Sequence, residues 1–162
     1  MARIKVYLIA RISEDAHLWN NKICSFLDKE RFEVFNPQEH NPWNKKHESF
    51  SDKVFQTDLD AIKNSDMGLL LPEYGKDCAW ECGWYSNSTK PCVAFVDTQF
   101  EWLRDWMVKG GIDYVVTNNQ ESFKILNQDP ILKLREIKLI SDFADIGNAL
   151  NDIYEKYLEQ SK

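Results

Sequence analysis

The sequence predicts an α/β fold in which helices cover both faces of a parallel sheet. Short apolar runs rich in β-branched residues alternate along the chain with longer segments whose apolar residues recur every three or four positions. The first run, Ile4 to Ala10, is apolar at nearly every position, as expected of a strand buried on both faces. Strands that alternate with helices form right-handed βαβ units, which build a parallel sheet.

The first half of the chain is predicted to hold three strands and two long helices. Ala16, Trp19, Ile23 and Leu27 place one apolar stripe along the first helix, and Pro72 ends the third strand. The segment after the second strand has two prolines and no apolar period, which indicates a loop long enough to cover a site. In chain order we expect a strand at 4–10, a helix at 14–29, a strand at 32–35, a loop at 36–46, a helix at 49–64 and a strand at 67–71.

The second half continues the same alternation. Gly110 and Gly111 end one helix, and the closing helix is expected to turn Phe143, Ile146, Leu150 and Ile153 inward. We expect a turn at 75–77, a helix at 78–88, strands at 92–96 and 114–117, helices at 100–108 and 122–126, and an extra strand at 137–140. The predicted architecture is a flavodoxin-like or Rossmann-like three-layer sandwich with five parallel strands, a possible extra edge strand and one domain over residues 1–162.

Composition excludes several classes of protein. A net charge of -6 and a pI near 5.1 argue against nucleic acid as a partner, because phosphate neutralisation needs surplus Lys and Arg. The N-terminal apolar run ends at Arg11, far below the length of a signal peptide or a membrane span, so we expect a cytoplasmic protein without a membrane partner. The four cysteines include no CxxC pair and are expected to be reduced. Cys78 and Cys82 lie one helical turn apart, but no histidine is near them in sequence, and no metal site is predicted.

Two carboxylates are candidates for chemistry in the crevice at the carboxyl ends of the strands. Glu81 follows the third strand near the start of a helix, where the helix dipole is expected to keep a nucleophilic carboxylate ionised. Asp58 lies on the helix that leads into the same strand. Two acids near one glycosidic carbon suit glycoside cleavage, since one traps the oxocarbenium centre and the other binds or protonates. The alternative is that both are ordinary carboxylates at helix starts.

The chain resembles the nucleoside 2-deoxyribosyltransferase family, which includes 2-deoxynucleoside 5-phosphate N-hydrolases. The resemblance is carried by the runs from Asp58 to Met67 and from Gly75 to Trp84, and by the strand Val6 to Ala10. It implies that Glu81 is the nucleophile that attacks the anomeric carbon of a nucleoside or nucleotide. It also implies that Asp58 contacts the sugar hydroxyl and the leaving base, and that Tyr7 orients the nucleophilic carboxylate. Neither a metal nor an organic cofactor is implied.

The resemblance is less complete at the residues that would select the substrate. Many transferases of the family have a base-reading Asp six residues before the nucleophile, where this chain has Gly75. Asp77 faces the base or only caps the helix. The family also borrows two residues from a neighbouring subunit to close the sugar end of the site. Asp105 and Met107 stand in those positions, which implies a homodimer or a higher homo-oligomer.

The 5 position of the sugar divides hydrolases of nucleotides from transferases of nucleosides. Arg11 and Ser13, just after the first strand, could hold a phosphate, and Lys76 could assist. Asp105 would instead suit a free hydroxyl, so the two signals conflict. His40 and His47 flank the long loop and are further candidates for contact with the ligand.

Three functions follow from these observations. The first is a deoxyribosyl transferase or hydrolase with a covalent glycosyl-Glu81 intermediate. The second is a glycohydrolase acting on a ribonucleotide or NAD. The third is a non-catalytic nucleotide-binding or sensor module, against which the pairing of Glu81 with Asp58 counts.

Overall fold

A single parallel sheet of six strands, in the order β2-β1-β3-β4-β5-β6, organises the computed structural model. The structure describes residues 2–40, 51–71, 74–97 and 105–160. The five-stranded parallel sheet predicted from the sequence is confirmed, and the expected extra strand is β6 at one edge. The strand order reverses between β1 and β3, and the carboxyl ends of strands at such a switch point are where α/β proteins are expected to have a ligand crevice.

The elements follow the predicted alternation closely. In chain order they are β1 (Ile4–Ile9), α1 (Glu14–Phe26), β2 (Phe32–Phe35), α2 (Pro37–His40), α3 (Ser51–Asn64), β3 (Met67–Leu70), α4 (Lys76–Ser86), β4 (Cys92–Val96), α5 (Trp106–Gly110), β5 (Tyr114–Thr117), α6 (Gln120–Gln128), β6 (Glu136–Leu139) and α7 (Ile146–Gln160). Two short 3-10 helices, at Leu132–Leu134 and Phe143–Asp145, precede β6 and α7.

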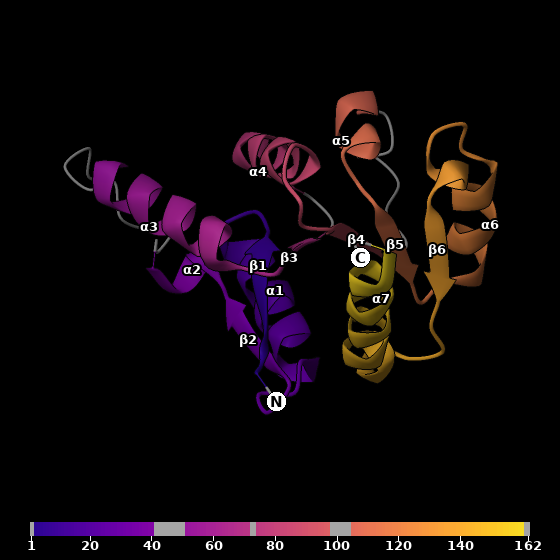
Figure 1. Ribbon diagram of the computed structural model, residues 1–162, viewed down its shortest axis with the longest axis horizontal. Coiled ribbons are helices and arrows are strands. Elements are labelled where there is room, and N and C mark those ends of the chain that lie inside the picture. Colours follow the sequence, from indigo (N-terminus) through magenta and orange to yellow (C-terminus); the bar gives the residue numbers. More distant parts are fainter. Residues whose placement is uncertain (1, 41–50, 72–73, 98–104, 161–162) are drawn as a thin grey trace.

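The two faces of the sheet are buried under different sets of helices. Alternate residues of the strands form one apolar cluster with α1 and α7 and another with α3, α4, α5 and α6. Figure 1 shows α4 and α5 above the sheet and α1 and α7 below it, so the three-layer arrangement expected from the sequence is confirmed. Tyr7 and Ile9 of β1 point to the α4 side, and Val6 and Leu8 point to the α1 side.

Some details of the prediction were wrong, among them the turn expected at 75–77, of which Lys76 and Asp77 are already helical. Residues 37–40 form the short helix α2 instead of part of a loop, while residues 41–50 lie outside the described residues. Of the helix expected at 100–108, residues 100–104 lie outside the described residues, Asp105 is not helical, and α5 runs from Trp106 to Gly110, two residues beyond the expected end. Phe143 packs inward as expected, but it belongs to a separate 3-10 turn, because Asp142 caps that turn through a hydrogen bond to the Ala144 N–H.

Among the residues that the structure describes, no helix is long and apolar enough to cross a membrane.

Candidate active site

Tyr7 and Glu81, which are far apart in sequence, meet directly in the structure. The Tyr7 hydroxyl donates a hydrogen bond of 2.6 Å to Glu81 Oε1. Tyr7 is fully buried in the interior of β1, and Glu81 is half-buried in the second turn of α4. The phenol therefore fixes one carboxylate oxygen and leaves the other for a ligand.

A glycine in β3 lets α4 pack closely enough for this contact. Gly68 pairs with Tyr7 across the strands, and a Cβ atom at position 68 would lie 2.7 Å from the ring of Tyr85. Tyr85 lies on α4, one turn beyond Glu81, and its hydroxyl shares a 2.6 Å hydrogen bond with Ser65 Oγ. The small residue thus makes room for the ring that anchors α4 over β1 and β3.

Asp58 adds a second carboxylate to the same crevice. It lies on α3 one turn before the buried Ile62, and its charge is close enough to raise the pKa of Glu81. Its Oδ1 atom is buried and has no hydrogen-bond partner among the described residues. A buried carboxylate oxygen without a donor is costly, so a ligand hydroxyl or N–H group placed here would be strongly favoured.

An aromatic stack lies alongside the two acids. The ring of Phe35 stacks on Tyr7 with centroids 5.5 Å apart and on His40 with centroids 4.6 Å apart. His40 is near enough to lower the pKa of Asp58 through its charge. The structure therefore places His40 beside the acid pair, whereas His47 lies outside the described residues.

Burial controls the ionisation of these groups. It raises the pKa of Glu81 to about 8 against the opposing effect of the Tyr7 hydrogen bond, and it raises the pKa of Asp58 to about 6. Burial and the neighbouring Glu81 charge also raise the pKa of Tyr7, which stays a neutral donor. The expectation that the helix dipole keeps Glu81 ionised was wrong for the free protein, because the residue lies beyond the first turn and burial has the larger effect.

Asp77 lies in the first turn of α4. Gly75 is the N-cap residue of α4 and Asp77 is the second residue of the helix, so Asp77 is not the N-cap. The charge of its exposed carboxylate raises the pKa values of both Glu81 and Asp58, so Asp77 lies near the two acids. Lys76 opens the helix and is exposed.

The segment after β1 carries the two residues predicted to hold a phosphate. Arg11 is exposed, and its backbone carbonyl accepts a hydrogen bond of 3.1 Å from Asn20 Nδ2. Ser13 is the N-cap of α1, and its hydroxyl oxygen accepts a hydrogen bond from the Ala16 N–H at 3.2 Å. Both residues follow the carboxyl end of β1, the strand that carries Tyr7.

The short helix α5 presents the two residues expected to reach a neighbouring subunit. Asp105 is its N-cap and accepts a hydrogen bond from the Tyr74 hydroxyl, while Met107 is 90% exposed. The buried Lys109 pairs with Asp129 at 2.6 Å and holds α5 against the end of α6. The preceding residues of the family-like segment, 102–104, lie outside the described part of the chain.

The four cysteines are free thiols, and Cys78 and Cys82 are buried on either side of Glu81. Within the described residues, no three His, Cys, Asp or Glu side chains form a group that could hold a metal ion.

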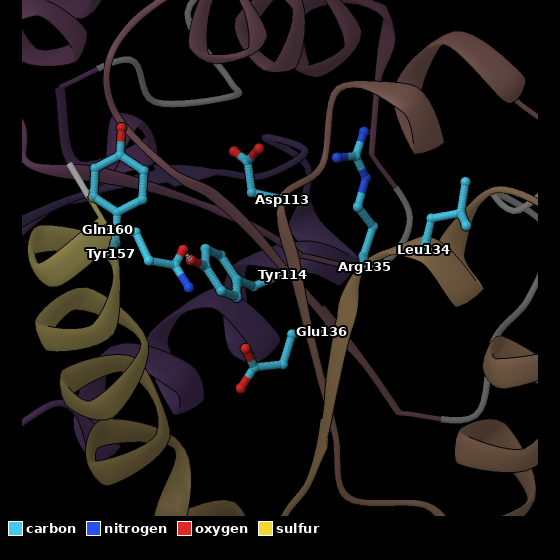
Figure 2. A pocket seen from close by; sticks show the side chains of 7 residues that line it. All are labelled: Asp113, Tyr114, Leu134, Arg135, Glu136, Tyr157 and Gln160. Carbon is cyan, nitrogen blue, oxygen red and sulfur yellow. Dashed lines mark hydrogen bonds between the residues drawn. The ribbon is translucent and has the colours of Figure 1, made fainter.

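A shallow groove of about 330 Å³ lies at the opposite, amino edge of the sheet. Figure 2 shows its lining: Asp113, Tyr114, Leu134, Arg135, Glu136, Tyr157 and Gln160. None of these residues belongs to the predicted site, so the groove is separate from the crevice of Tyr7 and Glu81.

The geometry agrees with a comparison against protein families. A family model described as "Nucleoside 2-deoxyribosyltransferase like" matches residues 3–100, more than half of the 162-residue chain. The chain belongs to the nucleoside 2-deoxyribosyltransferase-like family. The matched part contains Tyr7, Asp58 and Glu81 and ends before α5. The resemblance inferred from the sequence is therefore confirmed at the level of the family.

Several solved structures are similar to this family member at low sequence identity. A 2-deoxyribosyltransferase from the psychrotolerant bacterium Bacillus psychrosaccharolyticus is 19% identical, with a TM-score of 0.60 and coverage of 89% of this chain and 90% of that one. A conserved protein from Enterococcus faecalis V583 is 18% identical, with a TM-score of 0.52 and coverage of 98% and 99%. A CMP N-glycosidase from Clostridium botulinum is 20% identical, with a TM-score of 0.47 and coverage of 80% and 97%. A search of curated proteins found no match.

Proposed function

We propose that the chain cleaves or transfers the N-glycosidic bond of a nucleoside, a deoxynucleoside or the corresponding 5-monophosphate, through a covalent glycosyl-Glu81 intermediate. The observation that carries the proposal is the hydrogen bond from the Tyr7 hydroxyl to Glu81 Oε1, with the Asp58 carboxyl in the same crevice. Membership of the nucleoside 2-deoxyribosyltransferase-like family supports it.

The proposed first step breaks the bond between the sugar and the base. Glu81 Oε2 attacks the anomeric carbon while Tyr7 holds Oε1, and the base departs with the electron pair of the C–N bond. The protonated form of Asp58 donates a proton to the leaving base. The raised pKa of Asp58, about 6, keeps a usable fraction of this form near neutral pH.

The second step releases the sugar from the protein. Water or an acceptor base attacks the anomeric carbon, the glycosyl ester breaks, and Glu81 regains its carboxylate. Asp58 takes up the proton that the attacking group loses. Water as the attacking group gives hydrolysis, and a second base gives transfer.

Exposed apolar residues on α5 support the proposal that a second copy of the chain completes the site. Trp106 and Met107 are 75% and 90% exposed. Two adjacent large apolar side chains that are exposed on a five-residue helix favour an interface between subunits. We place Asp105 and Met107 at the sugar end of the partner's site.

The proposal is tested by chromatography of the purified protein with nucleosides, deoxynucleosides, their 5-monophosphates and NAD, with and without a second free base. Wild-type protein should release or exchange base from at least one class, and Glu81→Gln should release none. Glu121→Gln, an exposed acid in the first turn of α6, is the matched control and should behave as wild type. A wild-type protein that turns over no substrate contradicts the catalytic proposal and favours a nucleotide-binding module.

The covalent intermediate has a separate test. A 2-fluoro deoxynucleoside analogue destabilises the oxocarbenium transition state and slows release of the sugar, so a glycosyl ester should accumulate. Peptide mass spectrometry should place the added sugar on Glu81. Base release that proceeds undiminished in Glu81→Gln would overturn the assignment of the nucleophile.

A further inference from the structure

Three polar side chains are buried under the loop that joins β1 to α1, although the surrounding layer is apolar. Asn20, Asn36 and Gln38 are only 1%, 2% and 5% exposed. They come from α1, the turn after β2 and α2. Buried amides are costly unless they are hydrogen-bonded, so their presence here calls for a specific reason.

The amides form a connected network. Asn20 Nδ2 donates to Gln38 Oε1 at 3.1 Å, and Gln38 Nε2 donates to Asn21 Oδ1 at 2.7 Å. The Gln38 backbone N–H in turn donates to Asn36 Oδ1 at 3.4 Å. α1 and α2 are thus held together by side-chain amides with little freedom to move apart.

One hydrogen bond connects this network to the loop after β1. Asn20 Nδ2 also donates to the backbone carbonyl of Arg11 at 3.1 Å. This carbonyl belongs to the second residue after β1, next to the buried Ala10. The Arg11 backbone is therefore held by a buried side chain, while the Arg11 side chain is exposed just after the carboxyl end of β1.

The acidic residues of the crevice make a nearby arginine necessary for phosphate binding. Asp58 and the exposed Asp77 give the crevice negative charge near neutral pH, and this charge repels a phosphate unless a cation lies close by. Arginine suits this role, because its planar guanidinium binds phosphate oxygens in pairs. Pairwise binding needs a fixed backbone, since small displacements break the two-point geometry.

We infer that Asn20 and Gln38 are positioning residues that hold Arg11 in place to bind the 5-phosphate of a nucleotide substrate. The inference rests on the proposed function for the identity of the sugar, and it deepens that function by favouring 5-monophosphates over free nucleosides. Asn20 acts directly on the Arg11 carbonyl, and Gln38 acts by orienting Asn20.

The test measures the affinity of the full chain for 2-deoxyribose 5-phosphate and for 2-deoxyribose by calorimetry. Asn20→Leu keeps the side-chain size and removes the hydrogen bonds that Asn20 Nδ2 donates to Arg11 and Gln38. Gln38→Met removes the acceptor that orients Asn20. We expect Asn20→Leu to raise the Kd of the sugar phosphate by about tenfold or more, the size expected for a charged hydrogen bond, and Gln38→Met to raise it less. The Kd of the unphosphorylated sugar should stay within about twofold of wild type.

Two controls separate positioning from general loss of structure. Ile23→Val alters the buried face of α1 one turn beyond Asn20 without touching an amide, and both affinities should stay unchanged. In an Arg11→Ala background, Asn20→Leu should have no further effect on the Kd of the sugar phosphate, because the two residues act as one unit.

Two results would overturn the inference: folded Asn20→Leu and Gln38→Met proteins that bind the sugar phosphate as tightly as wild type, or a wild-type protein that binds both sugars equally. Failure of the proposed function looks different. A protein that binds the sugar phosphate through Arg11 and Asn20 but releases base from no nucleotide contradicts catalysis and leaves the positioning role intact.

Discussion

The hydroxyl of Tyr7 donates a 2.6 Å hydrogen bond to Glu81 Oε1 from a fully buried position in β1. This bond favours the ionised form of Glu81 and fixes its rotation. We expect Tyr7→Phe to lower kcat/KM by about 10- to 100-fold, because a hydrogen bond to a charged group is worth about 1.5–3 kcal/mol. Steady-state kinetics and denaturant unfolding test this together. A variant that loses stability but keeps its rate would show that Tyr7 only fills the core.

The pH dependence of the reaction follows from the pair of acids. Burial raises the pKa of Glu81 to about 8 and that of Asp58 to about 6. Attack needs an ionised carboxylate and base departure needs a protonated one, so the active form carries one proton on the pair. Both groups are neutral below about pH 6 and both are charged above about pH 8. We expect kcat/KM to follow a bell with limbs near pH 6 and pH 8.

Substitution of Asp58 should change the shape of that profile. Asp58→Asn removes both the proton donor and the negative charge that helps to raise the pKa of Glu81. The rate should fall by about 10²- to 10⁴-fold and rise with pH in a single step below pH 8. Asp60→Asn, an exposed position on α3, is the matched control and should keep the bell. A bell that survives in Asp58→Asn would assign the second limb to another group.

The same ionisation predicts how stability changes with pH. The pKa of Glu81 rises from its ordinary value near 4.5 to about 8 in the folded chain, so folding favours the protonated form. This contribution is complete below about pH 4.5 and is lost as the pH rises through about 8. Glu81→Gln should therefore gain stability relative to wild type across this window, by at most about 5 kcal/mol. Urea unfolding at about pH 5 and about pH 9 measures the change, and an equal difference at both values would contradict the buried ionisation of Glu81.

Two glycines near the site should respond in opposite directions to the same substitution. In Gly68→Ala the new methyl would lie 2.7 Å from the Tyr85 ring and 2.9 Å from Ile9 Cδ1, which should cost about 1–3 kcal/mol. Gly83 is exposed on α4 with no atom near its missing side chain, so Gly83→Ala should stabilise the helix by about 0.5–1 kcal/mol. Chemical unfolding measures both. Equal changes in unfolding free energy for the two variants would show that α4 does not pack closely against Gly68.

Most of the fold could be predicted because its signals are local. A buried strand such as β1 is apolar at consecutive positions, and α1 carries its apolar residues at helical spacing. The contact between Tyr7 and Glu81 could also be predicted, since parallel strands bring their carboxyl ends to one edge and the family motif names both residues.

The remaining features depend on contacts that no local pattern records. α2 has four residues, too few to show a helical period. Asn20 and Gln38 read as ordinary polar residues in the sequence, and only the packing of α1 on α2 reveals that they are buried and bonded. The ionisation of Glu81 was predicted with the wrong sign, because burial is a property of the whole site and not of the helix end.

The proposed exchange of residues between subunits can be tested by complementation. If Asp105 and Met107 of one copy complete the site of another, the double variant Asp105→Ala/Met107→Ala should lose most activity while its own Tyr7 and Glu81 stay intact. Glu81→Gln is inactive for a different reason and keeps a normal α5. When the two inactive proteins are mixed and their subunits exchange, some sites receive an intact Glu81 from one chain and an intact α5 from the other.

In a dimer whose subunits mix at random, half of the molecules are mixed and each holds one complete site. Equal amounts of the two variants should then recover about a quarter of wild-type activity. Mixing Glu81→Gln with Tyr7→Phe is the control. Both substitutions lie in the part of the site that one chain supplies, so exchange cannot restore an intact site. An equal mixture should have about half the activity of the Tyr7→Phe protein alone. Exchange that yields no activity, measured alongside a size measurement that confirms mixed dimers, would show that each chain completes its own site.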